Sequence, residues 1–171
     1  STIKSGIFVH SGKWYAEFLI INESTVGAMV GVASREASGR DFLGATSGGV
    51  GYNHDGNIYA NGNAPFAGGA PLADGNIVGI AVDVDANEIK FYINNSLQRT
   101  LTSIMASEIC FAAGHGGEIV ALNCGQDSSF AGQKTRQGNT DANDIGDFYY
   151  APPAGHLALC SANLPETAID P

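Results

Sequence analysis

The alternation of apolar and polar positions is most regular between Asp74 and Leu101. Every second residue from Val78 to Val84 is a branched aliphatic residue, and the alternation resumes across Ile89–Ile93. A period of two is typical of a strand with one face in a hydrophobic core. Asp85–Asn87 suits a tight turn, because Asp and Asn tolerate left-handed backbone, and Asn94–Asn95 marks a second turn. We therefore expect three contiguous antiparallel strands in a meander.

Further short β-prone runs, separated by turn residues, occupy much of the remaining chain. Lys13–Ile21 is apolar on both faces, so we expect both faces of this strand to be covered. His54–Gly56 has the composition of a hairpin tip. The other expected strands are Ile7–His10, Ala28–Ser34, Gly49–Asn53, Asn57–Ala60, Ile109–Ala113 and Glu118–Asn123. The pattern predicts an all-β fold, a β-sandwich of two antiparallel sheets with long rim loops.

The phase of the alternation also predicts which side chains form the core. Residues of one phase within each strand should face the opposite sheet. The predicted core residues are Trp14, Phe18, Val32, Val78, Ile80, Val82, Ile89, Phe91 and Ile93.

Composition narrows the possible partners. The 23 glycines among 171 residues favour a chain with many turns. The net charge is -9 with only 8 Lys and Arg residues, so no basic patch is available for nucleic acid or for an anionic membrane. No apolar run reaches the length of a membrane span. The three cysteines form an odd set, which favours free thiols, with a Cys110–Cys124 pair as the alternative.

Few residues suggest chemistry. Glu17 is the candidate acid, but no second carboxyl group stands at a matching position, and a structural role is the stronger interpretation. Neither a G-x-S-x-G motif nor paired histidines occur, so we expect no catalytic residue, no zinc site and no cofactor. Asp83–Glu88 has the spacing that begins a calcium loop but lacks its glycine, and a hairpin turn is the simpler interpretation.

A second acidic stretch is a better metal candidate. Three carboxylates and one amide lie within seven residues, at Asp141, Asn143, Asp144 and Asp147. Oxygen ligands at short spacing are what calcium requires. The alternative is a solvated loop in which the Asp and Asn side chains form local turns.

Several short motifs resemble the SPRY domain. The opening motif of that family is matched at Gly12–Tyr15, Glu17 and Phe18, with Ala16 in place of an aromatic residue. Gly31–Val32 and Asn123–Gln126 follow in the family's order. The central hairpin matches at Gly79, Asp83, Phe91, Tyr92 and Asn94. The resemblance implies a SPRY-like sandwich in which Glu17 is held by backbone or hydroxyl donors.

The end of the chain resembles the SPRY-containing virion proteins of tailed phages. An aromatic-Pro-Pro-x-Gly segment begins at Phe148, and an Asn-Leu-Pro tail begins at Asn163. We expect the sandwich to span residues 1–130, a polar insert loop 131–147, and a terminal segment 148–165 that packs back on the sandwich. Residues 166–171 then read as the start of a linker.

This resemblance predicts a non-catalytic binding or structural module of a phage virion, assembled in the host cytoplasm and extracellular when mature. Its partners would be other virion proteins or a host-surface glycan or protein, with a possible homo-oligomer through the parent protein. Loops are the expected contact surface, because aromatic side chains near Asn and Asp suit sugar and protein recognition. The predicted contact residues are Tyr52, Asn53, His54, Asp55, Tyr59 and Phe66, within the loops Arg35–Gly48, Gly51–Asn63, Pro65–Ala73 and Gly132–Asp147.

Two alternatives belong to other classes. One is a cellular SPRY adaptor module that grips a short peptide of a partner protein. The other is a glycan hydrolase of the tailspike type, which needs two carboxyl groups facing each other across the scissile bond.

Overall fold

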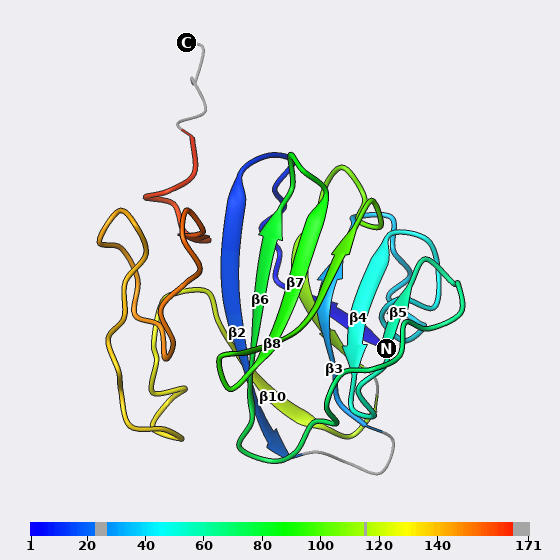
Figure 1. The fold of residues 1–171 in the computed structure, drawn as a ribbon, viewed down its shortest axis with the longest axis horizontal. Helices are drawn as coiled ribbons and strands as arrows, with labels where there is room; N and C mark the ends of the chain where they lie inside the picture. The colour runs from blue at the N-terminus through cyan, green and yellow to red at the C-terminus, as the bar shows by residue number, and fades with distance from the viewer. Residues whose placement is uncertain (23–26, 115, 166–171) are drawn as a thin grey trace.

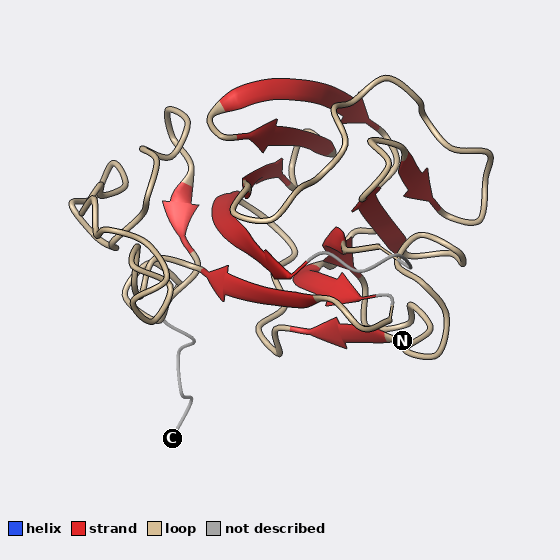
Figure 2. Ribbon diagram, turned by 90° about the horizontal axis from the view of Figure 1, so that it is seen from below, coloured by secondary structure: helices blue, strands red, loops and turns tan. Residues whose placement is uncertain are grey.

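The computed structural model describes residues 1–22, 27–114 and 116–165. Within them two antiparallel sheets pack face to face, so the predicted all-β sandwich is confirmed (Figures 1 and 2). The five-stranded sheet has the order β1-β9-β3-β4-β5 and the other sheet β10-β2-β6-β7-β8, with β11 beside β2. The strands are β1 (Thr2–Lys4), β2 (Lys13–Asn22), β3 (Met29–Ala33), β4 (Gly49–Asn53), β5 (Ile58–Ala60), β6 (Ile77–Asp83), β7 (Glu88–Ile93), β8 (Ser96–Thr102), β9 (Cys110–Gly114), β10 (Ile119–Asn123) and β11 (Leu157–Ala158).

The central meander has the predicted arrangement. β6 pairs with β7 from Val78 opposite Ile93 to Asp83 opposite Glu88, and β7 pairs with β8. Asn87 adopts a left-handed φ of 48° in the connecting turn, as its side chain permits. β2 pairs with the other edge of β6, so four neighbouring strands form a continuous sheet.

The core lies between the sheets, and all nine predicted core residues are buried there. Val82 and Ile80 from β6 and Phe91 from β7 have no exposed side-chain surface. The described part of the chain contains no helix with the length and apolar character needed to cross a membrane. All three cysteines are free thiols.

The prediction for the first strand is wrong. The structure places β1 at Thr2–Lys4, paired with β9, whereas the stretch Ile7–His10 contributes only one bridge, from Val9 to Ile109. Gly6 has a φ of 87°, which turns the chain out of the extended conformation between the two segments. Available hydrogen-bonding partners on β9 therefore decide where the first strand lies, and the apolar run at Ile7 does not.

Residues 128–165 form an arm that covers the outer face of the β2–β6 sheet, and Figure 1 shows this part of the chain beside β2. Phe148 packs edge-on against Tyr15, with the ring centroids 5.2 Å apart. Phe130 packs against Leu19 on the same face. β11 pairs in parallel with the start of β2, next to the stretch of β2 that pairs with β10. The arm therefore covers the second face of β2, as the apolar composition of that strand predicts.

Glu17 fastens the arm to the sheet. Its carboxylate is completely buried and accepts backbone N–H bonds from Tyr149 (2.8 Å) and Tyr150 (2.7 Å). The Asn123 amide and the Tyr15 hydroxyl donate to the same carboxylate over 3.3 Å each. Burial raises the pKa of Glu17, and these four hydrogen bonds oppose the rise. The structural interpretation of Glu17 is confirmed, because the carboxylate lies under the arm.

Asp141 organises the second acidic stretch. One carboxylate oxygen accepts the backbone N–H groups of Asn143 (2.8 Å) and Ile145 (3.0 Å). The other accepts the N–H of Ala158 in β11 (2.8 Å) and the side-chain amide of Asn163 (2.7 Å). The carboxylate thus forms a local turn and also holds the end of the arm.

Asp147 is used in a similar way, since it accepts the Ser128 hydroxyl and the Arg136 guanidinium, each at 2.6 Å. Asp144 is exposed and has a left-handed φ of 58°. Calcium binding would need the oxygens of Asp141 and Asp147 that these donors already occupy. The stretch therefore matches the local-turn alternative and does not present a set of calcium ligands. The run expected to begin a linker, residues 166–171, lies outside the described residues.

We expect Val82→Ala to lower the free energy of unfolding by about 1–3 kcal/mol, because it removes two buried methyl groups and leaves a cavity. Chemical denaturation measures this change. Thr102→Ala, at an exposed position on β8, should shift the midpoint little. An unchanged midpoint for Val82→Ala would contradict the assigned core.

Glu17→Gln should loosen the arm, because a Gln side chain has only one acceptor oxygen and places an NH2 group against one of the two N–H donors. A buried donor left without an acceptor costs about 1–3 kcal/mol. Limited proteolysis should show faster cleavage within residues 128–165. The matched variant Glu118→Gln lies before β10, where Glu118 is half-buried and accepts the N–H of Gly116, and it should be cleaved like the wild type. Equal cleavage of both variants would show that Glu17 does not hold the arm.

Acid should loosen the arm as well. Burial alone would raise the pKa of the Asp141 and Asp147 carboxyl groups. The hydrogen bonds that they accept lower it by more, so the pKa of each group lies below its usual value of 3.8. A carboxyl group with a lowered folded pKa contributes stability above its unfolded pKa and loses it as the pH falls through the folded value. Glu17, with a raised pKa, does not add to this loss.

Pepsin cleavage of the arm should therefore accelerate as the pH falls below 3.8, after correction for the pH dependence of pepsin on an unfolded substrate. Asp141→Asn should weaken the dependence, and Asp144→Asn should leave it unchanged. A cleavage rate independent of pH in the wild type would contradict the assignment.

Candidate functional site

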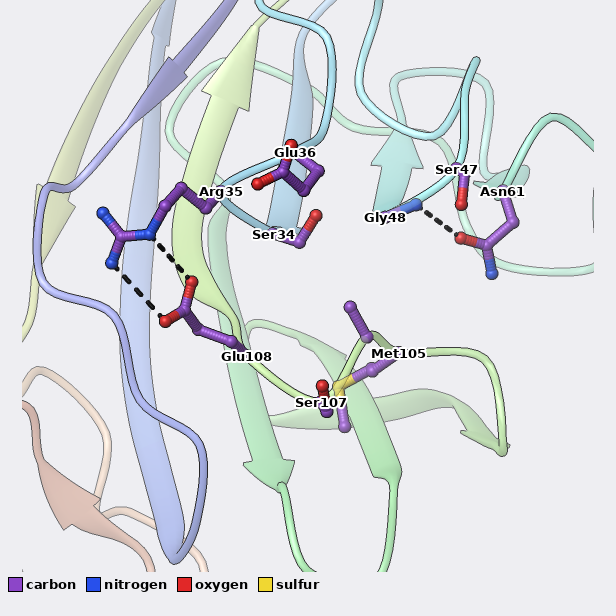
Figure 3. A pocket seen from close by; sticks show the side chains of 10 residues that line it. Ser34, Arg35, Glu36, Ser47, Gly48, Asn61, Met105, Ser107 and Glu108 are labelled. Carbon is purple, nitrogen blue, oxygen red and sulfur yellow. Dashed lines mark hydrogen bonds and ion pairs between the residues drawn. The ribbon is translucent and has the colours of Figure 1, made fainter.

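A cleft of about 690 Å³ opens at one end of the sandwich (Figure 3). The cleft is lined by the β3–β4 loop, the loop after β5 and the loop between β8 and β9. Ser34–Glu36 and Ser47–Gly48 are the two ends of the β3–β4 loop, Asn61 follows β5, and Met105–Glu108 precede β9. The cleft is therefore assembled from segments far apart in the sequence.

Two asparagines fix the walls of the cleft. Asn61 accepts the backbone N–H of Gly48 (2.9 Å) and donates to the carbonyl of Ile104 (2.7 Å), so it joins the β3–β4 loop to the β8–β9 loop. Asn87 donates to the carbonyl of Met105 and accepts its N–H, both at 2.9 Å. These long-range bonds hold the loops in one arrangement before any partner arrives.

Arg35 is also held in place. Its guanidinium pairs with Glu108 at 3.1 Å and lies 4.2 Å from the centre of the Phe8 ring. The Lys4 ammonium supports the same loop by donating to the carbonyls of Arg35 (2.9 Å) and Ala37 (2.8 Å). Arg35 therefore forms part of the wall.

Other polar groups of the cleft remain available. Glu36, Ser47 and Ser107 are exposed, and their side chains make no hydrogen bond or ion pair with any residue that the structure describes. Ala106 adds partly exposed apolar surface beside them, and Met105 lines the cleft but is only 7% exposed. Hydroxyl and carboxylate groups next to apolar surface, on fixed loops, suit recognition of another protein.

Tyr52, a predicted contact residue, does not lie on the rim. Its side chain is fully buried, its ring lies 5.5 Å from that of Phe91, and its hydroxyl donates to the carbonyl of Ala70 (2.6 Å). Burial, with a smaller effect of Asp55, raises the pKa of Tyr52 to about 12. The expectation that Tyr52 is exposed is corrected, because Val50 and Tyr52 share the inward phase of β4.

The hairpin tip contains three more of the predicted residues. Asn53 is buried, and its Oδ1 has no hydrogen-bond partner among the described residues. His54 is half-buried, and its carbonyl accepts the N–H of Leu72 (2.7 Å). Asp55 is exposed and accepts both the backbone N–H and the side-chain amide of Asn57, each at 2.9 Å. Of the three, only Asp55 is exposed.

Tyr59 and Phe66 are half-buried. Tyr59 packs edge-on against Phe42, with the ring centroids 5.3 Å apart. Phe66 bridges Ile58 of β5 and packs on the main core. Binding through these residues and the tip stays a prediction.

The predicted contact loops do not form one surface. β4 begins beside the cleft and ends at the hairpin tip, so its length of about 17 Å separates the two. The loop Arg35–Gly48 therefore belongs to the cleft end, whereas the tip and Pro65–Ala73 lie at the opposite end. The Met105–Glu108 segment was not among the contact segments predicted from the sequence. Its only signal was the pair of turn-forming residues, Asn61 and Asn87, whose side chains reach it.

Comparisons with known proteins agree with this architecture. The family model of the SPRY domain matches residues 13–127, which is well over half of the chain and leaves out the arm. The crystal structure of the SPRY domain of human HERC1 superposes with a TM-score of 0.60 at 23% identity, covering 71% of this chain and 80% of that one.

A crystal structure of a human SPRY domain superposes with a TM-score of 0.57 at 18% identity, covering 71% of this chain and 93% of that one. SPRY domains are in general non-catalytic modules that bind proteins. The sandwich, the family match and the sequence motifs around Glu17 and the central hairpin lead to one assignment: the chain belongs to the SPRY domain family.

Proposed function

We propose that the chain is a non-catalytic protein-recognition module and that an extended segment of its partner lies in the cleft at the β3–β4 loop. The observation that carries this proposal is the pair of asparagine bridges, Asn61 and Asn87, which fix the cleft walls. A preformed site loses little conformational entropy when a partner binds. The free Ser47 and Ser107 hydroxyls can bond the backbone of an extended segment.

The arm is separate from this function. It covers the outer face of β2 and β6, whereas the cleft opens among loops of β3, β4, β5 and β9. Covering that face leaves the loops as the exposed surface best suited to recognition, and loops on a rigid scaffold commonly carry binding residues. The hairpin tip with Asp55, together with Tyr59 and Phe66, is the alternative set of contact residues.

The setting is a further part of the proposal. The sequence from Phe148 to Pro165 supports a phage virion, with another virion protein or a host-surface molecule as partner, while a cellular SPRY adaptor fits the family assignment equally. Mass spectrometry of phage particles purified from the organism that carries the gene distinguishes the virion protein from the cellular adaptor. Detection in stoichiometric amount supports the virion, and absence from particles supports the adaptor.

Blocking the cleft tests the binding site. We expect peptides selected on the wild-type domain from a random display library to bind Ser107→Trp at least about tenfold more weakly, because the indole fills the cleft. Fluorescence anisotropy measures the affinities. Ala73→Trp, at an exposed position near the hairpin tip, is the matched control and should bind like the wild type.

Circular dichroism confirms that both variants fold. Peptides that bind Ser107→Trp unchanged but lose affinity for Ala73→Trp would place the site at the opposite end. Failure to select any peptide on the wild-type domain would also contradict the proposal.

A further inference from the structure

We infer that the partner segment is basic and places a lysine or arginine side chain against Glu36. This inference rests on the proposed function and names the chemistry of the partner that the cleft accepts.

The charges of the cleft carry the first step. Among the residues that the structure describes, three with charged side chains line the cleft: Arg35, Glu36 and Glu108. Arg35 and Glu108 neutralise each other in a two-pronged contact, with nitrogen-to-oxygen distances of 3.1 and 3.4 Å. Glu36 is exposed and makes no ion pair within the described part of the chain. One unit of negative charge therefore remains in the cleft.

Two cations close to Glu36, Lys4 and Arg35, have other partners. Lys4 lies against the β3–β4 loop, where its ammonium donates to the carbonyls of Arg35 and Ala37. Arg35 is held between Glu108 and the Phe8 ring. Turning either side chain to Glu36 would break these contacts. A cation supplied by a partner costs the domain no such contact.

The apolar surface of the cleft supports the same partner. Figure 3 shows Glu36 and Ser47 on one wall, with Met105 and Ser107 across the opening. Lysine and arginine have long aliphatic stems that pack on apolar surface while the charged head reaches a polar group. Ala106 offers partly exposed apolar surface for such a stem, whereas Met105 is only 7% exposed and packs into the main core. A neutral or acidic side chain would leave Glu36 without an opposite charge.

The charge of the whole chain acts in the same direction. At -9 the domain attracts basic segments and repels acidic ones during the encounter. This long-range effect is not specific to the cleft, so the test has to separate it from a contact with Glu36. A charge-removing variant outside the cleft provides that separation.

Three random decapeptide libraries, with a central Lys, Glu or norleucine, test the inference. We expect the Lys library to yield most binders on the wild-type domain. Glu36→Gln should weaken these binders by about two- to fivefold, the range for one exposed ion pair. Glu36→Lys should shift selection toward the Glu library. Asp144→Asn removes one charge from the arm and should leave the affinities unchanged.

The outcomes separate the inference from the proposed function. Binders that Ser107→Trp abolishes, but that arise equally from all three libraries and ignore Glu36→Gln, would overturn the basic partner and retain the cleft. If Glu36→Gln and Asp144→Asn weaken peptide binding equally, the preference for lysine comes from the charge of the whole chain. That result would also overturn the inferred contact with Glu36. Binders indifferent to Ser107→Trp would overturn both.

Discussion

The structure depends on the buried carboxylate of Glu17, which accepts four hydrogen bonds. Glu17 stands in the middle of β2, on the face turned away from the main core, where an unpaired charge would be costly. The N–H groups of Tyr149 and Tyr150 supply two of its four hydrogen bonds, and they come from the arm. The arm in turn buries apolar surface around Tyr15 and Leu19. The hydrogen bonds to the Glu17 carboxylate and the burial of the apolar surface around Tyr15 and Leu19 therefore both require the docked arm.

The cleft follows a related rule with neutral groups. Asn61 and Asn87 occupy left-handed turn positions, and their amide side chains reach backbone groups of another loop. Each asparagine thus turns its own chain segment and also holds a neighbouring loop at a fixed distance. Loops fixed in this way can vary in their exposed residues while their spacing is maintained. This separation of scaffold and contact residues suits a family of binding modules.

Local alternation was sufficient to predict the sheets, because burial of Val78, Ile80 and Val82 on one side is a property of their own strand. The local pattern gave wrong predictions where contacts with another part of the chain determine strand pairing or exposure. Ile7–His10 has the composition of a strand, but β9 offers its hydrogen-bonding edge to Thr2–Lys4. Tyr52 follows the inward phase of Val50, yet its polar neighbours at the hairpin tip suggested exposure. The cleft and the anchoring of Asp141 could not be predicted, because both depend on contacts between loops distant in sequence.

The arm has a consequence for the order in which the chain folds. The donors of Glu17 lie 132 and 133 residues further along the sequence. Closing such a large loop is slow, and contacts of high sequence separation generally form late. During synthesis the apolar outer face of β2 stays uncovered until residues 128–165 have left the ribosome. The domain therefore passes through a stage in which this sheet face is not yet covered by residues 128–165, and at that stage a chaperone or a second copy of the chain can occupy it.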